Sequence, residues 1–301
     1  MRLSVIITSY NEGDEVLKTI ESVRANTSDC EIILVDDAST DGSCPDSLVV
    51  SRILRHDTRQ GVVPSRMCGV RAAVGDCYAF LDAHQRVSEG CLNRCAELAL
   101  ESRCITYPDV IGFGHPDRKL HGAVMLQREG GAKDGVFDAK WRRRNPRDPV
   151  SRISSMISPG YVIPASCFES VRWSDGMENF GGSEPGVSVK AFFTDTDILH
   201  LCGPSAHHLF KGGRGSGFAC SWAREACNHA ITARVCFTDR TWRNYWVPQV
   251  FSKWLSAECL EWFDQEIAVR QHKQFQAIKQ RPDSEFWRGV QHKPAPEGVS
   301  D

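Results

Sequence analysis

Hydrophobic positions along the first third of the chain fall into short runs separated by stretches where they recur at helical spacing, such as Val16, Ile20 and Val23. The runs predict strands at residues 3–8, 31–35, 53–55 and 78–81, and the helical spacing predicts helices at 14–24, 46–52 and 64–74. Alternation of this kind is typical of an α/β protein with a mostly parallel sheet flanked by helices on both faces.

The C-terminal part of the chain has a different pattern. From residue 246 to residue 280, Trp, Phe and aliphatic side chains are spaced among charges, which predicts amphipathic helices. These helices could pack on the main domain or on a second copy of the chain, and from Pro282 onward we expect a weakly ordered tail. The predicted division is therefore a main domain at 1–248 and a C-terminal helical extension with tail at 249–301.

Composition narrows the class of protein. The chain is 41% hydrophobic and 25% charged with a net charge of −2, so it has no broad cationic field for nucleic acid or a membrane surface. The 13 cysteines are scattered singly, which favours reduced thiols over a disulfide framework. The first residues contain neither a charged leader nor a membrane-spanning apolar segment, and we expect a cytoplasmic protein without a membrane anchor.

Polar clusters follow three of the predicted strands. They cover residues 8–12, 36–42 and 82–84. In a parallel sheet the carboxyl ends of the strands meet at one edge, where ligands bind, so we expect these clusters to form one pocket. Each cluster also has a simpler interpretation as a turn or a helix cap.

The third cluster contains a candidate metal motif. Asp82 and His84 are two residues apart after a buried run, and in extended backbone such side chains project to one side, roughly 6.6 Å apart. They could therefore reach a single divalent cation. The alternative is that Asp82 caps the next helix and His84 is an ordinary surface residue.

Several motifs together carry a family resemblance that extends over residues 3–248. They are the segments at 5–12, 33–42, 61–69 and 82–84, followed by 155–163, the Met177-Glu178-Asn179-Phe180-Gly181-Gly182 segment and His208-Leu209-Phe210-Lys211. This chain thereby resembles family 2-like nucleotide-sugar glycosyltransferases of the GT-A fold. The Asp-x-His motif is similar to that of the polypeptide N-acetylgalactosaminyltransferases.

The resemblance implies a fold, a donor and a set of site residues. It implies a GT-A (Rossmann-like) sheet, a UDP-sugar donor, and Mn²⁺ or Mg²⁺ held by Asp82, His84 and His208. The implied donor-binding residues are Thr8, Tyr10, Glu12, Asp36, Asp37, Gly61, Arg66, Asp82, Ala83, Gly181 and Gly182. Arg66 could face the diphosphate or be an exposed helical residue, and the glycine-rich segment 212–217 could be a lid or a flexible surface loop.

Two departures from the family pattern leave the reaction open. The family has a glutamate directly after the paired glycines, whereas this chain has Ser183 there and Glu184 next. That register matches the catalytic base of some inverting GT-A enzymes, and Glu184 is the candidate catalytic residue. The family's membrane stem and lectin domain are not found in the sequence.

The expected function is metal-dependent transfer of a sugar to a hydroxyl or thiol of a peptide or small natural product. The basic run 140–144 could attract an anionic acceptor or be a solvated face. Two alternatives are an inverting enzyme that extends a glycan and a UDP-sugar-binding protein that has lost catalysis. A homo-oligomer through the C-terminal helices is a further possibility, and no nucleic acid is expected as a partner.

Overall fold

The N-terminal half of the chain builds a parallel sheet. In this computed structural model, which describes residues 2–44, 50–113, 115–131, 134–210, 222–263, 265–290 and 292–301, four parallel strands lie side by side in the order β4, β1, β2, β3. Their bounds are β1 Leu3–Ser9, β2 Cys30–Asp36, β3 Arg52–Arg55 and β4 Cys77–Asp82. The four strands match the predicted ones, whereas most of the predicted helix at 46–52 lies outside the described residues.

The second half of the sheet is mixed. Strand β11 (Val162–Pro164) is antiparallel to both β4 and β6 (Ile105–Gly112), and β12 (Ile198–His208) is parallel to β6. The edge strands are β5 Gln85–Val87, β7 His115–Leu120 and β10 Val150–Ile153, and a separate hairpin is formed by β8 Ala123–Gln127 and β9 Phe137–Trp141. The predicted α/β fold with a mostly parallel central sheet is confirmed.

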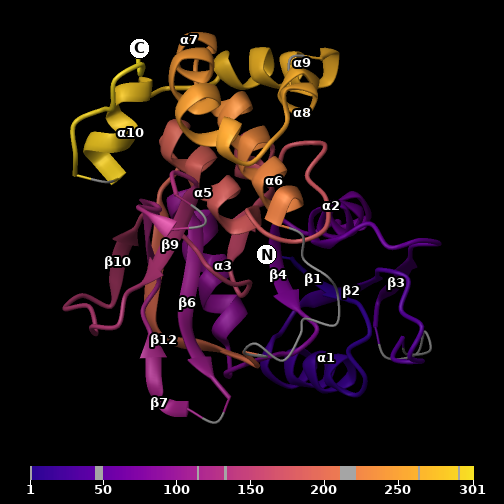
Figure 1. Cartoon of the computed structure of the whole chain (residues 1–301). Coiled ribbons are helices and arrows are strands. Elements are labelled where there is room, and N and C mark those ends of the chain that lie inside the picture. The colour runs from indigo at the N-terminus through magenta and orange to yellow at the C-terminus, as the bar shows by residue number, and fades with distance from the viewer. Residues whose placement is uncertain are drawn as a thin grey trace.

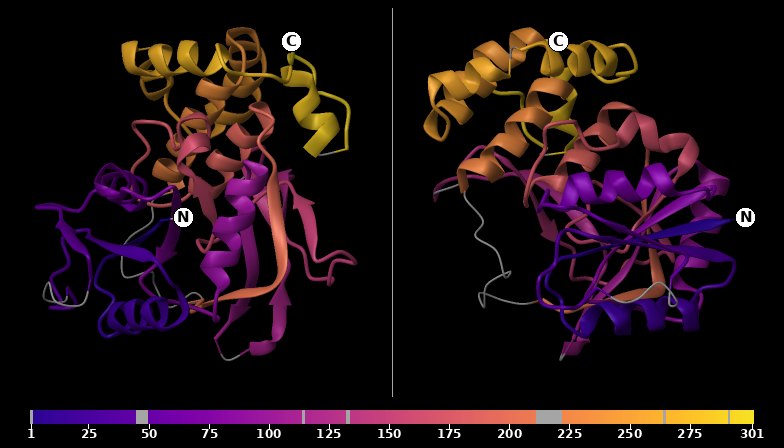
Figure 2. Two further views of the ribbon diagram at one scale, coloured as in Figure 1. Left: turned by 180° about the vertical axis from the view of Figure 1, so that it is seen from behind. Right: turned by 90° about the vertical axis from the view of Figure 1, so that its right-hand side faces the viewer.

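Helices cover both faces of the sheet (Figure 2), and strand β1 shows why. Its Ile6 side chain enters one hydrophobic cluster and its Val5 and Ile7 enter the other, because successive side chains of a strand point to opposite faces. The helices of the two faces are α1 Glu15–Asn26, α2 Val62–Ala72, α3 Cys91–Ser102, α4 Ala165–Val171 and α5 Ser183–Phe193. The sheet is therefore buried on both sides, as a parallel sheet requires.

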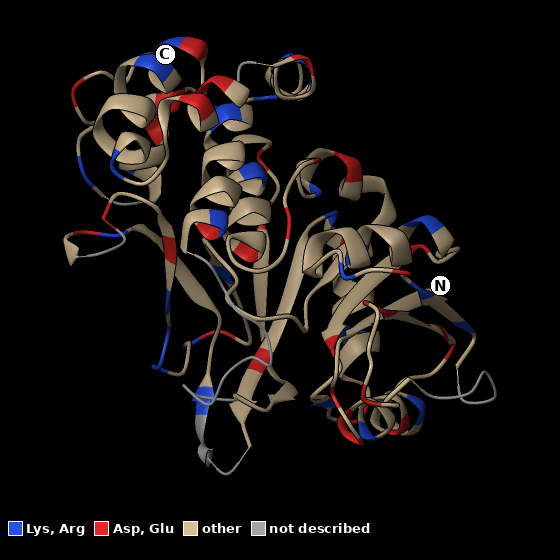
Figure 3. Cartoon of the chain, turned by 45° about the vertical axis from the view of Figure 1, so that its right-hand side comes forward, with Lys and Arg blue, Asp and Glu red and all other residues tan. Residues whose placement is uncertain are grey.

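The C-terminal helices gather beyond one end of the sheet (Figure 1). Their bounds are α6 Trp222–Cys236, α7 Asp239–Thr241, the π-helix η3 Trp242–Val250, the 3₁₀ turn η4 Phe251–Lys253, α8 Ala257–Trp262, α9 Glu266–Gln276 and α10 Asp283–Val290. Lys and Arg positions are interspersed with Asp and Glu positions on these helices (Figure 3), so this end of the molecule carries no field of a single sign. None of the helices in the described ranges is both long and apolar enough to cross a bilayer.

The expectation of a weakly ordered tail after Pro282 is wrong for helix α10. Phe286 is fully buried and Trp287 is 2% exposed, and both join the cluster that contains Phe237 and Trp246. The indole N–H of Trp287 donates to Gln127 Oε1 at 2.9 Å. Burial of these aromatic side chains therefore holds helix α10 on the rest of the protein. One hydrophobic core contains residues from both sides of position 248, and the domain boundary predicted there stays a prediction.

Candidate donor-binding site

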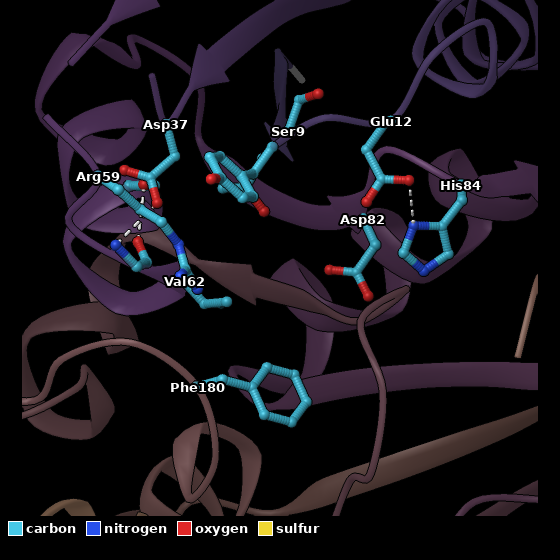
Figure 4. Close-up of a pocket in the computed structure, with 12 residues that line it drawn as sticks. Ser9, Glu12, Asp37, Arg59, Val62, Asp82, His84 and Phe180 are labelled. Carbon is cyan, nitrogen blue, oxygen red and sulfur yellow. Dashed lines mark hydrogen bonds and ion pairs between the residues drawn. The ribbon is translucent and has the colours of Figure 1, made fainter. Parts of the chain in front are cut away.

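A pocket lies at the carboxyl ends of β1, β2 and β4, where the polar clusters were expected to meet. Figure 4 shows Glu12, Asp82 and His84 on one side of it and Asp37 and Arg59 on the other. The lining residues are Thr8, Ser9, Tyr10, Glu12, Asp37, Arg59, Gly61, Val62, Ser65, Asp82, His84 and Phe180. All three polar clusters therefore contribute to one cavity.

The predicted metal ligands Asp82, His84 and His208 come together at the edge of this pocket. One donor atom from each side chain lies within 4.8 Å of those of the other two, and His208 Nε2 is 3.4 Å from Asp82 Oδ2. Strand β12 delivers His208 across the sheet from β4, which a spacing of 126 residues in the sequence could not indicate. Two imidazoles and a carboxylate at this separation fit a divalent cation such as Mn²⁺.

The charge on Asp82 is strongly favoured. Burial alone would raise its pKa, but the hydrogen bond from His208 and the electrostatic effects of His84, Arg66 and His208 hold the pKa of this carboxyl well below its usual range. An ionised carboxylate is the form that binds metal. Asp82 is therefore ready to act as a ligand at neutral pH.

Glu12 orients one of the candidate ligands. Its Oε2 lies 3.1 Å from Nδ1 of His84, which leaves Nε2 as the nitrogen that can face a cation. A carboxylate on the far nitrogen of a metal-binding histidine fixes the ring and its tautomer. Sequence reasoning assigned Glu12 to the uridine, whereas the structure gives it a contact to the metal-site histidine.

Asp37 holds the loop that forms the floor of the pocket. The backbone N–H groups of Gln60 and Gly61 donate to its two carboxylate oxygens at 2.7 and 2.8 Å. Gly61 in turn forms a β-bridge with Asn179 and has φ +101°, and a Cβ there would lie 2.3 Å from the Asn179 backbone nitrogen. Only glycine fits this position, because both the space and the dihedral exclude a side chain.

Arg66 and Glu184 form a buried ion pair beneath the pocket. Arg66, on α2, is 2% exposed, and its Nη1 donates to Glu184 Oε1 at 2.8 Å, while Nη2 lies 3.5 Å from Asp82 Oδ1. Although burial opposes the charge, the nearby Tyr161, Glu184 and Asp82 raise the pKa of Arg66. The alternative of an exposed helical arginine is wrong, and the side chain supports Asp82 rather than lining the cavity.

Glu184 is held in a way that does not suit a general base. It is 7% exposed, one oxygen receives Arg66, and the other accepts the Ser183 hydroxyl at 2.5 Å. Glu184 does not line the pocket, whereas a base must reach the proton that it removes. Its catalytic role stays a prediction that this geometry does not favour.

The remaining predicted donor residues divide into two groups. Thr8 and Tyr10 line the pocket, and the guanidinium of Arg59 lies over the Tyr10 ring, 4.8 Å from its centroid. Asp36 and Ala83 do not line it: Asp36 is fully buried beside Arg55, 3.2 Å from its Nε, and the Ala83 carbonyl accepts the Thr19 hydroxyl.

The paired glycines pack against a helix. Gly181 and Gly182 have positive φ, and a Cβ on Gly181 would lie 2.5 Å from Glu225 Cγ on α6. The Asn228 side-chain amide of the same helix donates to the carbonyls of Glu178 and Gly181, both at 2.9 Å. The glycines are thus explained by close approach to α6. The predicted lid at 212–217 lies outside the described residues.

Five pocket residues were not predicted: Ser9, Arg59, Val62, Ser65 and Phe180. Phe180 lies in the segment 177–182 that carries the family resemblance, which was a sequence signal for it, and the structure leaves its side chain 50% exposed. Arg59 precedes the loop glycine by two residues and had no such signal.

A basic groove adjoins the site. Its lining includes Lys140, Trp141, Arg143 and Arg144. The Trp141 ring contacts Phe210 edge-on, and Phe210 contacts the His208 ring, with centroids 6.4 and 4.4 Å apart respectively. The basic run of the sequence therefore reaches the metal-site histidine through two aromatic rings.

Comparison with known proteins agrees with this geometry. Residues 4–134 match the family described as Glycosyl transferase family 2. Polypeptide N-acetylgalactosaminyltransferase 16 of Mus musculus is 30% identical over 226 residues, which cover 69% of this chain and 40% of the relative. Polypeptide N-acetylgalactosaminyltransferase 3 of Drosophila melanogaster is 41% identical over 255 residues, covering 74% and 38%. The chain thus spans about two fifths of the length of these relatives.

Solved structures show the same fold. The crystal structure of GalNAc-T7 with UDP, GalNAc and Mn²⁺ superposes with a TM-score of 0.75 at 18% identity, covering 97% of this chain and 57% of that one. The structure of S. aureus TarS 1-349 in complex with UDP-GlcNAc gives a TM-score of 0.55 at 13% identity, covering 96% and 82%.

Proposed function

We propose that this chain transfers a sugar from a UDP-sugar to a hydroxyl group of a peptide. Its GT-A fold, the match of residues 4–134 to Glycosyl transferase family 2, and its similarity to the polypeptide N-acetylgalactosaminyltransferases support this proposal. The observation that carries this proposal is the Asp82, His84 and His208 triad at the edge of the pocket. Both halves of a donor site, a cation site and a cavity for a nucleotide, lie together.

The triad would hold Mn²⁺ or Mg²⁺. Such an ion, when bound, offsets the charge on the departing diphosphate as a Lewis acid. Glu12 contributes by fixing the His84 ring, and Arg66 contributes by holding the Asp82 carboxylate from below.

The other pocket residues suit the nucleotide. The Tyr10 ring can stack on a base, and the Arg59 guanidinium beside it can pair with a phosphate. Asp37 accepts from two backbone N–H groups, so we propose that it shapes the pocket floor and does not itself read the uracil. Phe180, half exposed on the opposite wall, is placed to contact the sugar side of the donor.

The proposed acceptor is a peptide with acidic residues. The relatives above are named for polypeptide substrates, which supports a peptide. The groove formed by Lys140, Trp141, Arg143 and Arg144 adjoins His208 through Phe210, and its cationic side chains complement carboxylates near the accepting hydroxyl.

The test is release of UDP from a panel of UDP-sugars, with and without Mn²⁺ and with acidic or neutral Ser/Thr peptides. His208→Ala should abolish metal-dependent turnover. His207→Ala is the matched control, because His207 is adjacent in sequence but lies 3.4 Å from Ser205 Oγ and outside the triad, and it should retain turnover. Mn²⁺-dependent UDP binding without turnover of any donor would instead support a donor-binding protein that has lost catalysis.

A further inference from the structure

A second group of potential ligands lies in the sheet away from the donor pocket. Asp109 on β6, His121 in the β7–β8 connection and His200 on β12 place their donor atoms within 4.8 Å of one another. None of the three lines the donor pocket. Gly112 pairs with His208, so Asp109 lies three residues back along β6, about 10 Å from the first triad.

The three donor atoms converge on one point. His121 Nδ1 lies 2.7 Å and His200 Nε2 lies 2.8 Å from the same carboxylate oxygen, Asp109 Oδ1. The other oxygen, Oδ2, accepts the backbone N–H of Gly203 at 2.9 Å. The carboxylate is thereby oriented with one oxygen hydrogen-bonded to both imidazoles, and a cation that binds here would replace these two hydrogen bonds with its bonds to Oδ1, His121 Nδ1 and His200 Nε2, releasing protons from the rings.

The hydrogen bonds within this cluster leave part of it unsatisfied. His200 is fully buried, and its Nδ1 has no hydrogen-bond partner among the described residues. This nitrogen points away from Asp109, because Nε2 of the same ring makes that contact, so it marks room for a water beside the cluster and not the cation position itself. If these side chains only filled space in the core, apolar residues of similar volume would stabilise the fold equally well.

The two triads differ in how deeply their side chains are buried, and this difference determines which cation each would bind. The Asp82 side chain is 24% exposed and opens on the pocket, whereas the side chains of Asp109, His121 and His200 are at most 7% exposed. An enclosed set of two imidazoles and one carboxylate suits four-coordinate Zn²⁺ with one water as the fourth ligand, whereas a six-coordinate cation would need room for three further ligands.

We propose that Asp109, His121 and His200 bind a structural Zn²⁺ ion that is separate from the donor-site metal. Three segments meet at this ion: β6, the part of β12 just before its irregular stretch between Leu201 and Ser205, and the connection that leads into β8. The Arg142 Nε, at the end of β9, donates to the His121 backbone carbonyl at 2.7 Å. The ion thus fastens the base of the β8–β9 hairpin, which carries the basic groove.

The first experiment removes the donor-site triad and asks whether zinc remains. The His84→Ala/His208→Ala protein is loaded with Zn²⁺, dialysed against metal-free buffer and analysed for metal by mass spectrometry. It should retain one equivalent of Zn²⁺ per chain. Adding Asp109→Asn and His200→Gln should remove that equivalent, whereas adding His272→Gln, a buried histidine that contacts the Arg234 carbonyl, should not.

A second measurement guards against variants that misfold and against zinc held by thiols. Far-UV circular dichroism checks that each variant is folded. Zn²⁺ should raise the thermal unfolding midpoint of the parent, the His84→Ala/His208→Ala protein, but not that of the same protein with Asp109→Asn and His200→Gln added. Folded parent protein that retains no zinc overturns the proposal. So does zinc that persists after the Asp109 and His200 substitutions, held for example by Cys227 and Cys259, whose sulfurs are 3.7 Å apart. Donor turnover is measured separately in the wild type, so either proposal can fail alone.

Discussion

Replacing Arg66 should lower the free energy of unfolding far more than replacing a surface arginine. Arg66→Met leaves the 7% exposed Glu184 carboxylate with the Ser183 hydroxyl as its remaining hydrogen-bond partner among the described residues. At a charge separation of about 4 Å and an effective dielectric constant near 20, the lost attraction is about 4 kcal/mol. Breaking a buried pair from one side commonly costs about 3–5 kcal/mol, and we expect a loss in that range in the free energy of unfolding.

The assay is urea unfolding at pH 7 without divalent metal, followed by tryptophan fluorescence and circular dichroism. The control is Arg128→Met, which breaks an exposed pair with Asp138, 2.7 Å apart, and should cost about 0–1 kcal/mol. The double variant Arg66→Met/Glu184→Leu should be less destabilised than the sum of its single variants by roughly 1–3 kcal/mol. An Arg66→Met loss equal to that of Arg128→Met would refute the reasoning, because it would mean that water reaches the pair.

Three further predictions concern other parts of the molecule. Burial lowers the pKa of Lys190 from 10.5 to about 8, so between these pH values the unfolded chain binds more protons than the folded protein. The free energy of unfolding should therefore rise from pH 8 to pH 10.5 by roughly 3 kcal/mol relative to Lys190→Met. Parallel pH profiles of the two proteins would contradict this. Glu12→Gln should weaken Mn²⁺ binding about 10- to 100-fold in a titration where Glu15→Gln, which removes a contact to Arg86, has no effect; equal affinities would show that Glu12 does not orient His84. Phe286→Ala should cost about 3–5 kcal/mol, whereas Ile278→Ala, at a 43% exposed position, should cost little; equal losses in urea unfolding would mean that α10 does not share the main core.

The parts of the fold that could be predicted are those with local signals. Strand runs located β1 to β4, because burial on both faces gives parallel strands an uninterrupted apolar run, and helical spacing located α1 and α2. Asp82 and His84 could be paired because they are two residues apart on one strand, and His208 joined them through the resemblance of its motif.

Other features depend on long-range contacts that no local pattern reveals. Arg66 meets Glu184 across 118 residues, so neither the burial of the arginine nor the engagement of the carboxylate could be read from the chain. Asp36 and Asp37 were treated as interchangeable, yet consecutive side chains of extended backbone point to opposite sides, and Asp37 alone lines the pocket. Helix α10 was missed because its short, charged sequence acquires stability from the aromatic core that it joins.

The β-bridge between Gly61 and Asn179 has a consequence for how donor preference could be altered. This bridge connects two loops: one is held by Asp37 and the other is held by Asn228 next to Phe180. The Val62 N–H donates to the Asn179 carbonyl at 2.9 Å. A substitution that changes the conformation of one loop should therefore shift the other. Under the proposed function, variants selected at residues 178–180 for a new donor sugar should therefore also change in nucleotide affinity, and the two properties need to be screened together.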